Sequence, residues 1–345
     1  MDKTITPISD DNFNYRLSRL MSCQLCNSDV LELISSKDAK SSEPLNISIC
    51  NTCGLIQQTS IPDEEELNRY YHHEYRQDYK GVYTPKAKHV YRAGKTALQR
   101  LNFLKSAGVK SGRMLDVGAG GGEFTYLADR TGFAARGVEP NKGYSEYARN
   151  EYQCNISTGN LDRITGQYDV ITLFHVLEHL PSPQSAFQQL YQLLSEEGYL
   201  LIEVPWIEAR DASPHNIYFK AHLYYFSIDT LTAAASQYFD AIMIDTASNL
   251  KILFRAKQAP SRLRLPETTS VVNIRQRLSQ KGWLEYLFQG RGLVKPFRKL
   301  AERMKERKAR NFRPKEILDQ FLPAQMGSTT LPRLNELKVP LTQNG

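Results

Sequence analysis

The sequence of 345 residues lacks the features of secreted and membrane-spanning chains. Residues 1–20 are polar and have neither the apolar stretch nor the small-residue cleavage site of a signal peptide. Nowhere is an apolar run long enough to cross a bilayer. There are only five cysteines. We therefore expect a cytoplasmic protein, in which thiols stay reduced and paired cysteines are more often metal ligands than disulfides.

Acidic residues are scarce in the last quarter of the chain. Residues 261–345 contain 18 Lys and Arg and 7 Asp and Glu, which gives a net charge of +11. Residues 1–260 contain 26 Lys and Arg and 30 Asp and Glu, which gives a net charge of −4. Between residues 293 and 304, apolar residues recur at helical spacing among basic ones: Leu293, Phe297, Leu300 and Met304. Such a helix either docks on its own domain with the basic face in solvent, or lies on an anionic membrane surface, such as the inner face of the membrane.

The middle of the chain alternates apolar strands with amphipathic helices, which predicts an α/β domain with a doubly wound sheet over residues 111–258. Its last two strands, near 241–245 and 250–256, are closely spaced and predict a hairpin that places one antiparallel strand at the sheet edge. The other predicted divisions of the chain are an arm (1–20), a cysteine-rich module (21–58), a connector with a helix (59–110) and a basic, mainly helical C-terminal extension (259–345).

A glycine-rich loop follows the first strand of the α/β region, at residues 115–122. Gly118, Gly120 and Gly122 allow the backbone to turn sharply and to approach a ligand closely. Glu139 ends the next strand, 21 residues after Gly118, where a carboxylate can bind ribose hydroxyls. A nicotinamide fingerprint would require glycine at position 123, but Glu123 stands there. The loop therefore favours a ligand without phosphates.

The glycine loop, together with residues 137–140, 168–180 and 198–205, resembles class I S-adenosylmethionine-dependent methyltransferases. The resemblance covers roughly residues 111–257 and implies a Rossmann-like sheet of seven strands. It implies that S-adenosylmethionine is held by eight residues: Asp116 and Gly118, Gly120 and Gly122 at the methionine part, Glu139 at the ribose, Asn160 and Leu161 near the adenine, and His175 after the fourth strand.

Four of the five cysteines form two C-x-x-C pairs separated by 23 residues, Cys23 with Cys26 and Cys50 with Cys53. Two such turns supply the four thiolates of a tetrahedral structural zinc site. The segment from Cys50 to Gln57, followed by Glu66 and a Tyr-Tyr pair at 70–71, resembles the zinc module that precedes certain bacterial methyltransferases, including sugar C-methyltransferases. That resemblance implies a methyl acceptor of the sugar type, either nucleotide-activated or in a surface polysaccharide.

The candidate general bases are histidines that follow the fourth and fifth strands. His222 matches the general-base histidine of the sugar C-methyltransferases, and His179 ranks second. Those enzymes place an acid directly before this histidine and a tyrosine three residues before it, whereas this chain has Ala221 and Phe219. Methylation at carbon or at oxygen therefore remains open.

Two further interpretations concern the same histidines and the whole protein. His175, Glu178 and His179 resemble the metal-binding cluster of quinone-pathway O-methyltransferases, although His175 stands where that pattern has Glu; we do not favour a catalytic ion. An RNA methyltransferase is an alternative because the tail is basic, but only Lys37 and Lys40 lie between Cys23 and Cys53, and nucleic acid is the less favoured partner. After the sugar and RNA methyltransferases, the third interpretation is a non-catalytic protein that binds the cofactor and serves as a scaffold.

Overall fold

The computed structural model describes residues 22–41, 43–61, 85–213 and 217–322. The predicted arm at 1–20 lies outside these residues, as do Glu66 and the Tyr-Tyr pair at 70–71. None of the described helices is both long enough and apolar enough to cross a membrane.

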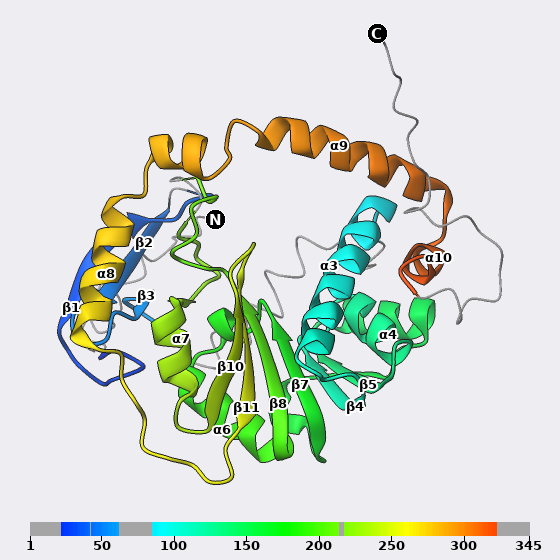
Figure 1. Cartoon of the computed structure of the whole chain (residues 1–345), viewed down its shortest axis with the longest axis horizontal. Coiled ribbons are helices and arrows are strands. Elements are labelled where there is room, and N and C mark those ends of the chain that lie inside the picture. Colours follow the sequence, from blue (N-terminus) through cyan, green and yellow to red (C-terminus); the bar gives the residue numbers. More distant parts are fainter. Residues whose placement is uncertain (1–21, 42, 62–84, 214–216, 323–345) are drawn as a thin grey trace, which may run out of the picture.

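The central sheet has seven strands in the order β10-β11-β8-β7-β4-β5-β6. Its strands are β4 (Gly112–Val117), β5 (Phe133–Glu139), β6 (Ile156–Thr158), β7 (Tyr168–Phe174), β8 (Leu194–Val204), β10 (Phe239–Asp245) and β11 (Leu250–Ala256). Pairing is parallel from β6 through β5, β4 and β7 to β8. The predicted doubly wound, seven-stranded α/β fold is confirmed (Figure 1).

The predicted hairpin is confirmed and lies at the sheet edge, but the strand that runs opposite to the rest of the sheet is the inner strand of the hairpin. β11 pairs antiparallel with both β10 and β8, which makes β10 the edge strand. The burial of the two strands gives the physical reason. Ile252, Leu253 and Phe254 of β11 are all buried, as expected for a strand covered on both faces, whereas Ile242 and Ile244 of β10 are exposed.

Helices cover both faces of the sheet because successive strand residues point to opposite sides. Leu115 and Ile171 pack in one core cluster with α6 (Pro183–Leu193) and α7 (Ile228–Ala235). Met114 and Val170 pack in a second cluster with α3 (Ala87–Ser106) and α4 (Glu123–Asp129). The next helix, α5 (Lys142–Tyr147), continues as a π-helical turn, Ala148–Tyr152.

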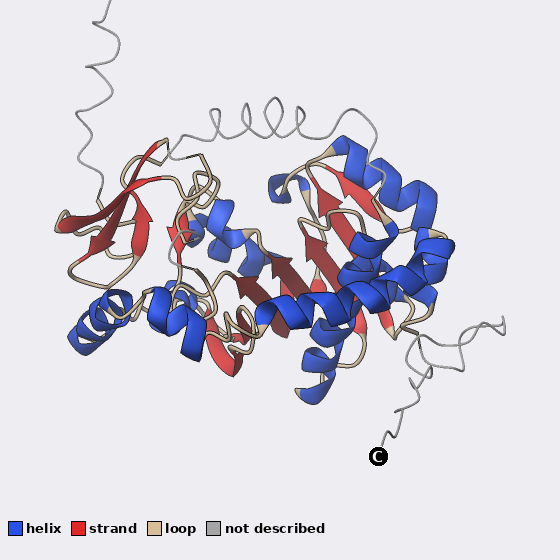
Figure 2. Ribbon diagram, turned by 90° about the horizontal axis from the view of Figure 1, so that it is seen from above, coloured by secondary structure: helices blue, strands red, loops and turns tan. Residues whose placement is uncertain are grey.

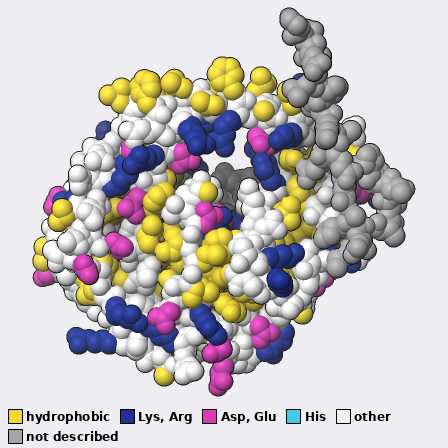
Figure 3. Space-filling view, in the orientation of Figure 1, with side chains coloured by type: hydrophobic (Ala, Val, Ile, Leu, Met, Phe, Trp, Pro, Cys, Tyr) yellow, Lys and Arg dark blue, Asp and Glu magenta, His cyan; other side chains and the backbone are white. Residues whose placement is uncertain are grey.

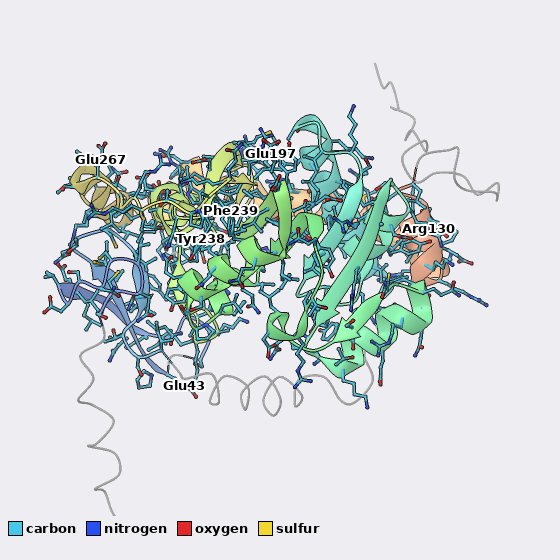
Figure 4. All side chains as sticks on the ribbon, turned by 90° about the horizontal axis from the view of Figure 1, so that it is seen from below. Glu43, Arg130, Glu197, Tyr238, Phe239 and Glu267 are labelled. Carbon is cyan, nitrogen blue, oxygen red and sulfur yellow. The ribbon has the colours of Figure 1, made fainter. Side chains whose placement is uncertain are left out.

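The N-terminal module is a small sheet in the order β1-β2-β3-β9. Its strands are β1 (Leu31–Lys37), β2 (Pro44–Cys50), β3 (Ile56–Gln58) and β9 (Tyr224–Tyr225). The strand β9 belongs to the long connection after β8, so the domain of the central sheet supplies the last strand of the module's sheet. Figure 4 shows Glu43 of the module and Arg130 after α4 at opposite ends of the molecule.

The C-terminal extension connects the module to the far side of the central sheet (Figures 1 and 2). Its described helical segments are α8 (Thr268–Ser279), π-helical Glu285–Gln289, α9 (Lys295–Lys308), a 3-10 turn at Ala309–Asn311 and α10 (Pro314–Asp319). Arg275 of α8 pairs with Glu32 of β1 at 2.6 Å, and Leu318 of α10 contacts α3 at Gly94.

The predicted basic helix is present as α9, but it does not dock on its own domain through an apolar face. Glu302 and Glu306 face α3 and form ion pairs with Lys95 and Arg92 at 2.9 and 2.5 Å. The apolar side chains of α9 are exposed instead. The structure thus shows α9 docked on its own domain with its basic residues exposed, the first of the two alternatives from the sequence, and attached by salt bridges rather than by apolar packing.

Candidate functional site

The predicted site residues gather where the order of the strands reverses. From β4 the chain continues to β5 on one side, and later to β7 on the other. Ligands of open α/β sheets bind at this switch point, beyond the carboxyl ends of the strands. A Cβ on Gly118 would lie 2.4 Å from Val176 Cγ2, so the loops that follow β4 and β7 are in direct contact.

The glycine loop takes left-handed backbone conformations at Gly118, Gly120 and Gly122, with φ of +70°, +53° and +85°. A side chain on Gly122 would collide with Ala148, whereas a Cβ on Gly120 would meet no atom of the described residues within 4 Å. The backbone at Gly120 therefore borders open space. This is the part of the loop that a ligand can approach most closely.

Glu139, at the end of β5, is tied to the glycine loop. Its Oε2 accepts a hydrogen bond from Gly120 N–H at 2.9 Å, and its Oε1 accepts one from Asn141 N–H at 2.8 Å. Burial raises the pKa of Glu139, and these two bonds oppose the rise. Both amides hold the carboxylate at the strand end, in the position predicted for the residue that binds a ribose.

Asp116 lies beneath the glycine loop and is buried. Its carboxylate oxygens accept hydrogen bonds from Thr125 and Thr172, each at 2.8 Å. Burial raises the pKa of Asp116 to about 6, opposed by these threonines. The structure therefore shows Asp116 joining β4, α4 and β7, and its predicted contact with the cofactor stays a prediction.

Asn160 and Leu161 follow β6 at the same edge of the sheet. Gly159 N–H donates to the Glu139 carbonyl at 3.0 Å, which brings this loop next to the end of β5. Asn160 is exposed, and Leu161 is half-buried against the core. Their position fits the predicted contact with an adenine, which remains a prediction.

His175, after β7, is clamped between two buried carboxylates. Its Nδ1 lies 3.4 Å from Glu178 Oε1, and its Nε2 lies 3.5 Å from Glu203 Oε1. Arg100 Nε donates to the other oxygen of Glu203 at 2.8 Å. Burial disfavours the charged ring, but Glu178 and Glu203 prevail and raise the pKa of His175 to about 9. His175 is therefore a cation at neutral pH, and its predicted place in the cofactor site stays a prediction.

The two candidate bases, His179 and His222, lie side by side. Their ring centroids are 5.0 Å apart in an edge-to-face arrangement. His179 Nδ1 lies 2.7 Å from the Ala221 carbonyl, which makes Nδ1 the donor and leaves Nε2 with a free lone pair. Burial lowers the pKa of His222 to about 4, so this ring is neutral at pH 7 and able to accept a proton.

Glu178 lies under the histidine pair. It is buried, and neither of its carboxylate oxygens has a hydrogen-bond partner among the described residues. Its Oε1 is 3.9 Å from His179 Nε2. One ligand atom from each of Glu178, His179 and His222 lies within 4.8 Å of the others. The buried carboxylate of Glu178, which also pairs with His175, would stabilise a proton that either ring receives.

The comparisons with known proteins agree with this geometry. Residues 87–238 match the family model of a methyltransferase domain. This match, together with the strand order, supports the predicted class I S-adenosylmethionine-dependent methyltransferase fold, and it supports methyltransferase activity for these residues.

The relatives of the methyltransferase domain include ubiquinone biosynthesis O-methyltransferases. The protein of Shewanella pealeana is 30% identical over 112 residues, which is 29% of this chain and 48% of that protein. The protein of Aeromonas salmonicida is 30% identical over 114 residues, 30% of this chain and 48% of that protein. The match thus spans about half the length of these relatives.

Solved structures with similar folds have low identity to this chain. Magnesium protoporphyrin IX methyltransferase from Synechocystis PCC 6803, solved with bound S-adenosylmethionine, is 16% identical, covers 57% of this chain and 97% of its own, and gives a TM-score of 0.40. The PH0226 protein of Pyrococcus horikoshii is 16% identical. Its match covers 46% of this chain and 90% of that protein, with a TM-score of 0.38.

The N-terminal module holds the loop of the methyltransferase domain that carries His222. Gln58 Nε2 donates to the carbonyls of Lys220 and His222 at 2.8 and 3.0 Å. Asp38 Oδ2 accepts a hydrogen bond from Lys220 N–H at 2.6 Å. Sequence reasoning missed Gln58 and Asp38, because these contacts join residues more than 150 positions apart. The only signal was their proximity to the cysteine pairs.

The four paired cysteines converge at one point of the module. Their Sγ atoms all lie within 4.8 Å of one another, with Cys23–Cys53 at 3.4 Å and Cys26–Cys50 at 3.5 Å. Tetrahedral zinc with Zn–S bonds near 2.3 Å separates its sulfurs by about 3.8 Å, close to these distances. Asn27 and Gly54, each directly after a pair, have φ of 58° and 78°, so the two turns share one geometry.

The chemistry of the cysteine cluster also fits a cation. The hydrogen bond with Cys50 raises the pKa of Cys23 to about 12, while Cys23 lowers the pKa of Cys50. Leu25 N–H and Thr52 N–H point to the sulfurs of Cys23 and Cys50 at 3.5 and 3.4 Å. Such bonds stabilise thiolates, the form that zinc binds.

A pH dependence of stability follows from the clamp on His175. Its pKa is raised to about 9, so the charge pairing is complete below pH 6.5 and is lost as pH rises through about 9. Because the side chain is 40% exposed, solvent screening reduces the effect to about 1–2 kcal/mol. We expect the stability difference between wild type and His175→Gln, measured by urea unfolding, to shrink by this amount from pH 6.5 to 9. A stability difference that stays constant from pH 6.5 to 9 would contradict this prediction.

Proposed function

We propose that the protein transfers the methyl group of S-adenosylmethionine to a hydroxyl oxygen of a small-molecule or glycan acceptor. The observation that carries the proposal is the contact at the switch point of the sheet between the loop after β4, at Gly118, and the loop after β7, at Val176. A glycine loop and a carboxylate held by two backbone amides lie on one side, and a pair of imidazoles above a buried carboxylate lies on the other.

The residues of the first side fit the cofactor. Gly120 borders open space for its methionine part, Glu139 offers carboxylate lone pairs to ribose hydroxyls, and Asn160 with Leu161 borders the place of the adenine. When bound, S-adenosylmethionine supplies a methyl group on a positively charged sulfur. The chain must align the acceptor with that group and remove a proton from it.

The residues of the second side fit proton removal. His222 is neutral at pH 7, which is the form a general base requires. His179, with Nδ1 bonded to the Ala221 carbonyl, directs a free Nε2 lone pair near Glu178 and is the second candidate. Glu178 stabilises the imidazolium that forms. His222 remains our first choice.

Two considerations favour an oxygen acceptor over a carbon acceptor. The relatives in Shewanella and Aeromonas are named O-methyltransferases. The chain also has Ala221 and Phe219 where the sugar C-methyltransferases have an acid and a tyrosine. A sugar hydroxyl is the acceptor suggested by the resemblance of the N-terminal module, and a phenolic hydroxyl is the one suggested by the names of the relatives.

We also propose that Cys23, Cys26, Cys50 and Cys53 hold a structural zinc ion. The distances and the hydrogen bonds to sulfur support it. The ion would stabilise a sheet that is too small to have a large core of its own.

The acceptor class can be tested with purified protein, labelled S-adenosylmethionine and fractionated cell extract. Label in nucleotide-sugar or glycan pools supports a sugar acceptor, and label in a quinone-precursor fraction supports the phenolic one. Label confined to RNA would contradict the proposal, and so would the absence of any labelled product when cofactor binding is intact.

Replacing Glu139 with glutamine is expected to weaken the binding of S-adenosylmethionine about 10- to 100-fold, because hydrogen bonds to a charged acceptor contribute about 1.5–3 kcal/mol. Calorimetry with the cofactor and its demethylated product measures the change. Asp129→Asn is the matched control, since it removes an exposed carboxylate at the end of α4. Equal affinities for wild type and Glu139→Gln would remove Glu139 from the cofactor site.

A further inference from the structure

A strip of apolar side chains lies exposed along one side of the molecule. Figure 3 shows it as a row over α9 and the segment before α9. We call it the apolar strip; its residues are Leu284, Phe288, Leu293, Val294, Phe297, Leu300 and Met304. Leu284 is 75% exposed and Phe297 is 73% exposed. Contiguous exposed apolar surface of this kind marks a site of contact with a protein or a membrane.

The helix α9 is oriented opposite to an ordinary surface helix. Such a helix turns its apolar stripe toward the core and its charges toward water. In α9, Phe297, Leu300 and Met304 share the outward face, whereas Glu302 and Glu306 point to α3. The inward face is thus attached by charge, and the apolar face is left for something outside the fold.

The charges around the apolar strip are of one sign. Residues 283–310 contain three acidic side chains, and all three are turned inward and paired: Glu285 with Arg277 at 2.9 Å, Glu302 with Lys95 and Glu306 with Arg92. The same residues contain nine Lys and Arg. Those of α9 beside the strip, such as Lys299 and Arg303, are exposed. The outward side therefore combines apolar and basic side chains without a carboxylate.

We propose that the apolar strip and the basic residues around it seat the protein on an anionic bilayer surface. A helix with an apolar stripe and flanking Lys and Arg lies in the plane of the interface, with its apolar side chains among the acyl chains and its cations at the phosphates. The aromatic Phe288 and Phe297 add apolar area for this insertion.

A second copy of this chain suits the strip less well. In a symmetric dimer the same surface meets itself, which would place both sets of nine basic residues close together without acidic partners. An anionic lipid surface supplies the missing negative charge. Charge complementarity thus selects the bilayer over self-association.

The seating would turn the candidate active site toward the lipid. α9 is held on one side by α3, whose Arg100 reaches Glu203 at the carboxyl end of β8. On the other side, Lys295 Nζ donates to the carbonyl of Asp211, in the loop after β8, at 3.2 Å. Both supports of α9 therefore belong to the edge of the sheet that carries the site, and Figure 3 shows a hollow beneath α9 on this face.

Vesicle flotation of the full chain tests the proposal. We expect binding to vesicles that contain phosphatidylglycerol, weak binding to vesicles of phosphatidylcholine alone, and release at high salt. Leu300→Glu should lower the partition coefficient about tenfold or more. The charge reversals Lys299→Glu and Arg303→Glu should each lower it about fivefold. These experiments do not depend on methyl transfer, so their failure is distinguishable from failure of the proposed function.

The matched control is Leu33→Glu, because Leu33 of β1 is 56% exposed and Leu300 is 58% exposed. Leu33→Glu should bind vesicles like wild type, and all variants should keep the unfolding temperature of wild type. Absence of wild-type binding to the anionic vesicles, or equal binding by Leu300→Glu, overturns the proposal. Sedimentation that finds a wild-type dimer and a Leu300→Glu monomer, without vesicle binding, also overturns it in favour of a second copy.

Discussion

Replacing Cys50 with serine is expected to release zinc and to abolish methyl transfer while the cofactor still binds. Zinc contributes on the order of 10 kcal/mol of apparent folding free energy to small four-cysteine modules, so losing one thiolate should unfold β1 to β3. The loop that carries His222 would then lose its contacts with Gln58 and Asp38. The core cluster that Met114 and Val170 share with α3 and α4 includes none of the described residues of the module, so the domain should keep its affinity for S-adenosylmethionine.

Three measurements separate these effects: zinc content, hydrogen exchange across β1 to β3, and calorimetry with the cofactor. Cys154→Ser is the matched control, since this fifth cysteine lies in the methyltransferase domain, outside the cluster, and should leave zinc content unchanged. If Cys50→Ser retains stoichiometric zinc and a protected module, the four cysteines do not hold the metal as proposed.

Replacing His222 with alanine is expected to lower kcat by about 10²–10⁴-fold, the usual contribution of a general base, without changing the affinity for S-adenosylmethionine. The wild-type rate should hold as pH falls from 7 and decline only near pH 4, because the base acts in its neutral form and the pKa of His222 is about 4. Steady-state assays over pH, with the acceptor identified by labelling, provide the measurement.

The control for the histidine experiment is His89→Ala, an exposed histidine on α3. Its kcat should equal that of wild type. A normal rate for His222→Ala, together with a large loss for His179→Ala, would assign the base to His179. If both variants turned over normally, neither imidazole would take the proton of the acceptor.

These predictions connect the two sheets of the protein. β9 follows β8 of the methyltransferase domain and pairs with β3 of the module, Gln57 with Tyr224 and Ile56 with Tyr225. His222 lies directly before this pairing. The module is therefore part of the support of the candidate active site, and a zinc ion there would act on catalysis through position alone.

Local patterns in the sequence were enough for several elements of the fold and the site. Alternating apolar segments and helices predicted the doubly wound sheet, because strand and helix periodicity are local properties of the chain. The spacing of Gly118, Gly120 and Gly122 predicted the sharp loop, since only glycine tolerates positive φ there at no cost. The two C-x-x-C pairs predicted the cysteine cluster, because each pair forms a turn from residues that are adjacent in the sequence.

Tertiary structure alone decided the features that depend on distant residues. β10 lies at the edge because β11 is the strand whose residues can be buried on both faces. The hydrogen bond of Gln58 to the His222 loop joins residues 164 positions apart. The outward face of α9 was settled by Arg92 and Lys95 of α3, which draw Glu306 and Glu302 inward. Helical periodicity shows that a helix has two different faces, but the charges of its neighbours determine which face turns inward.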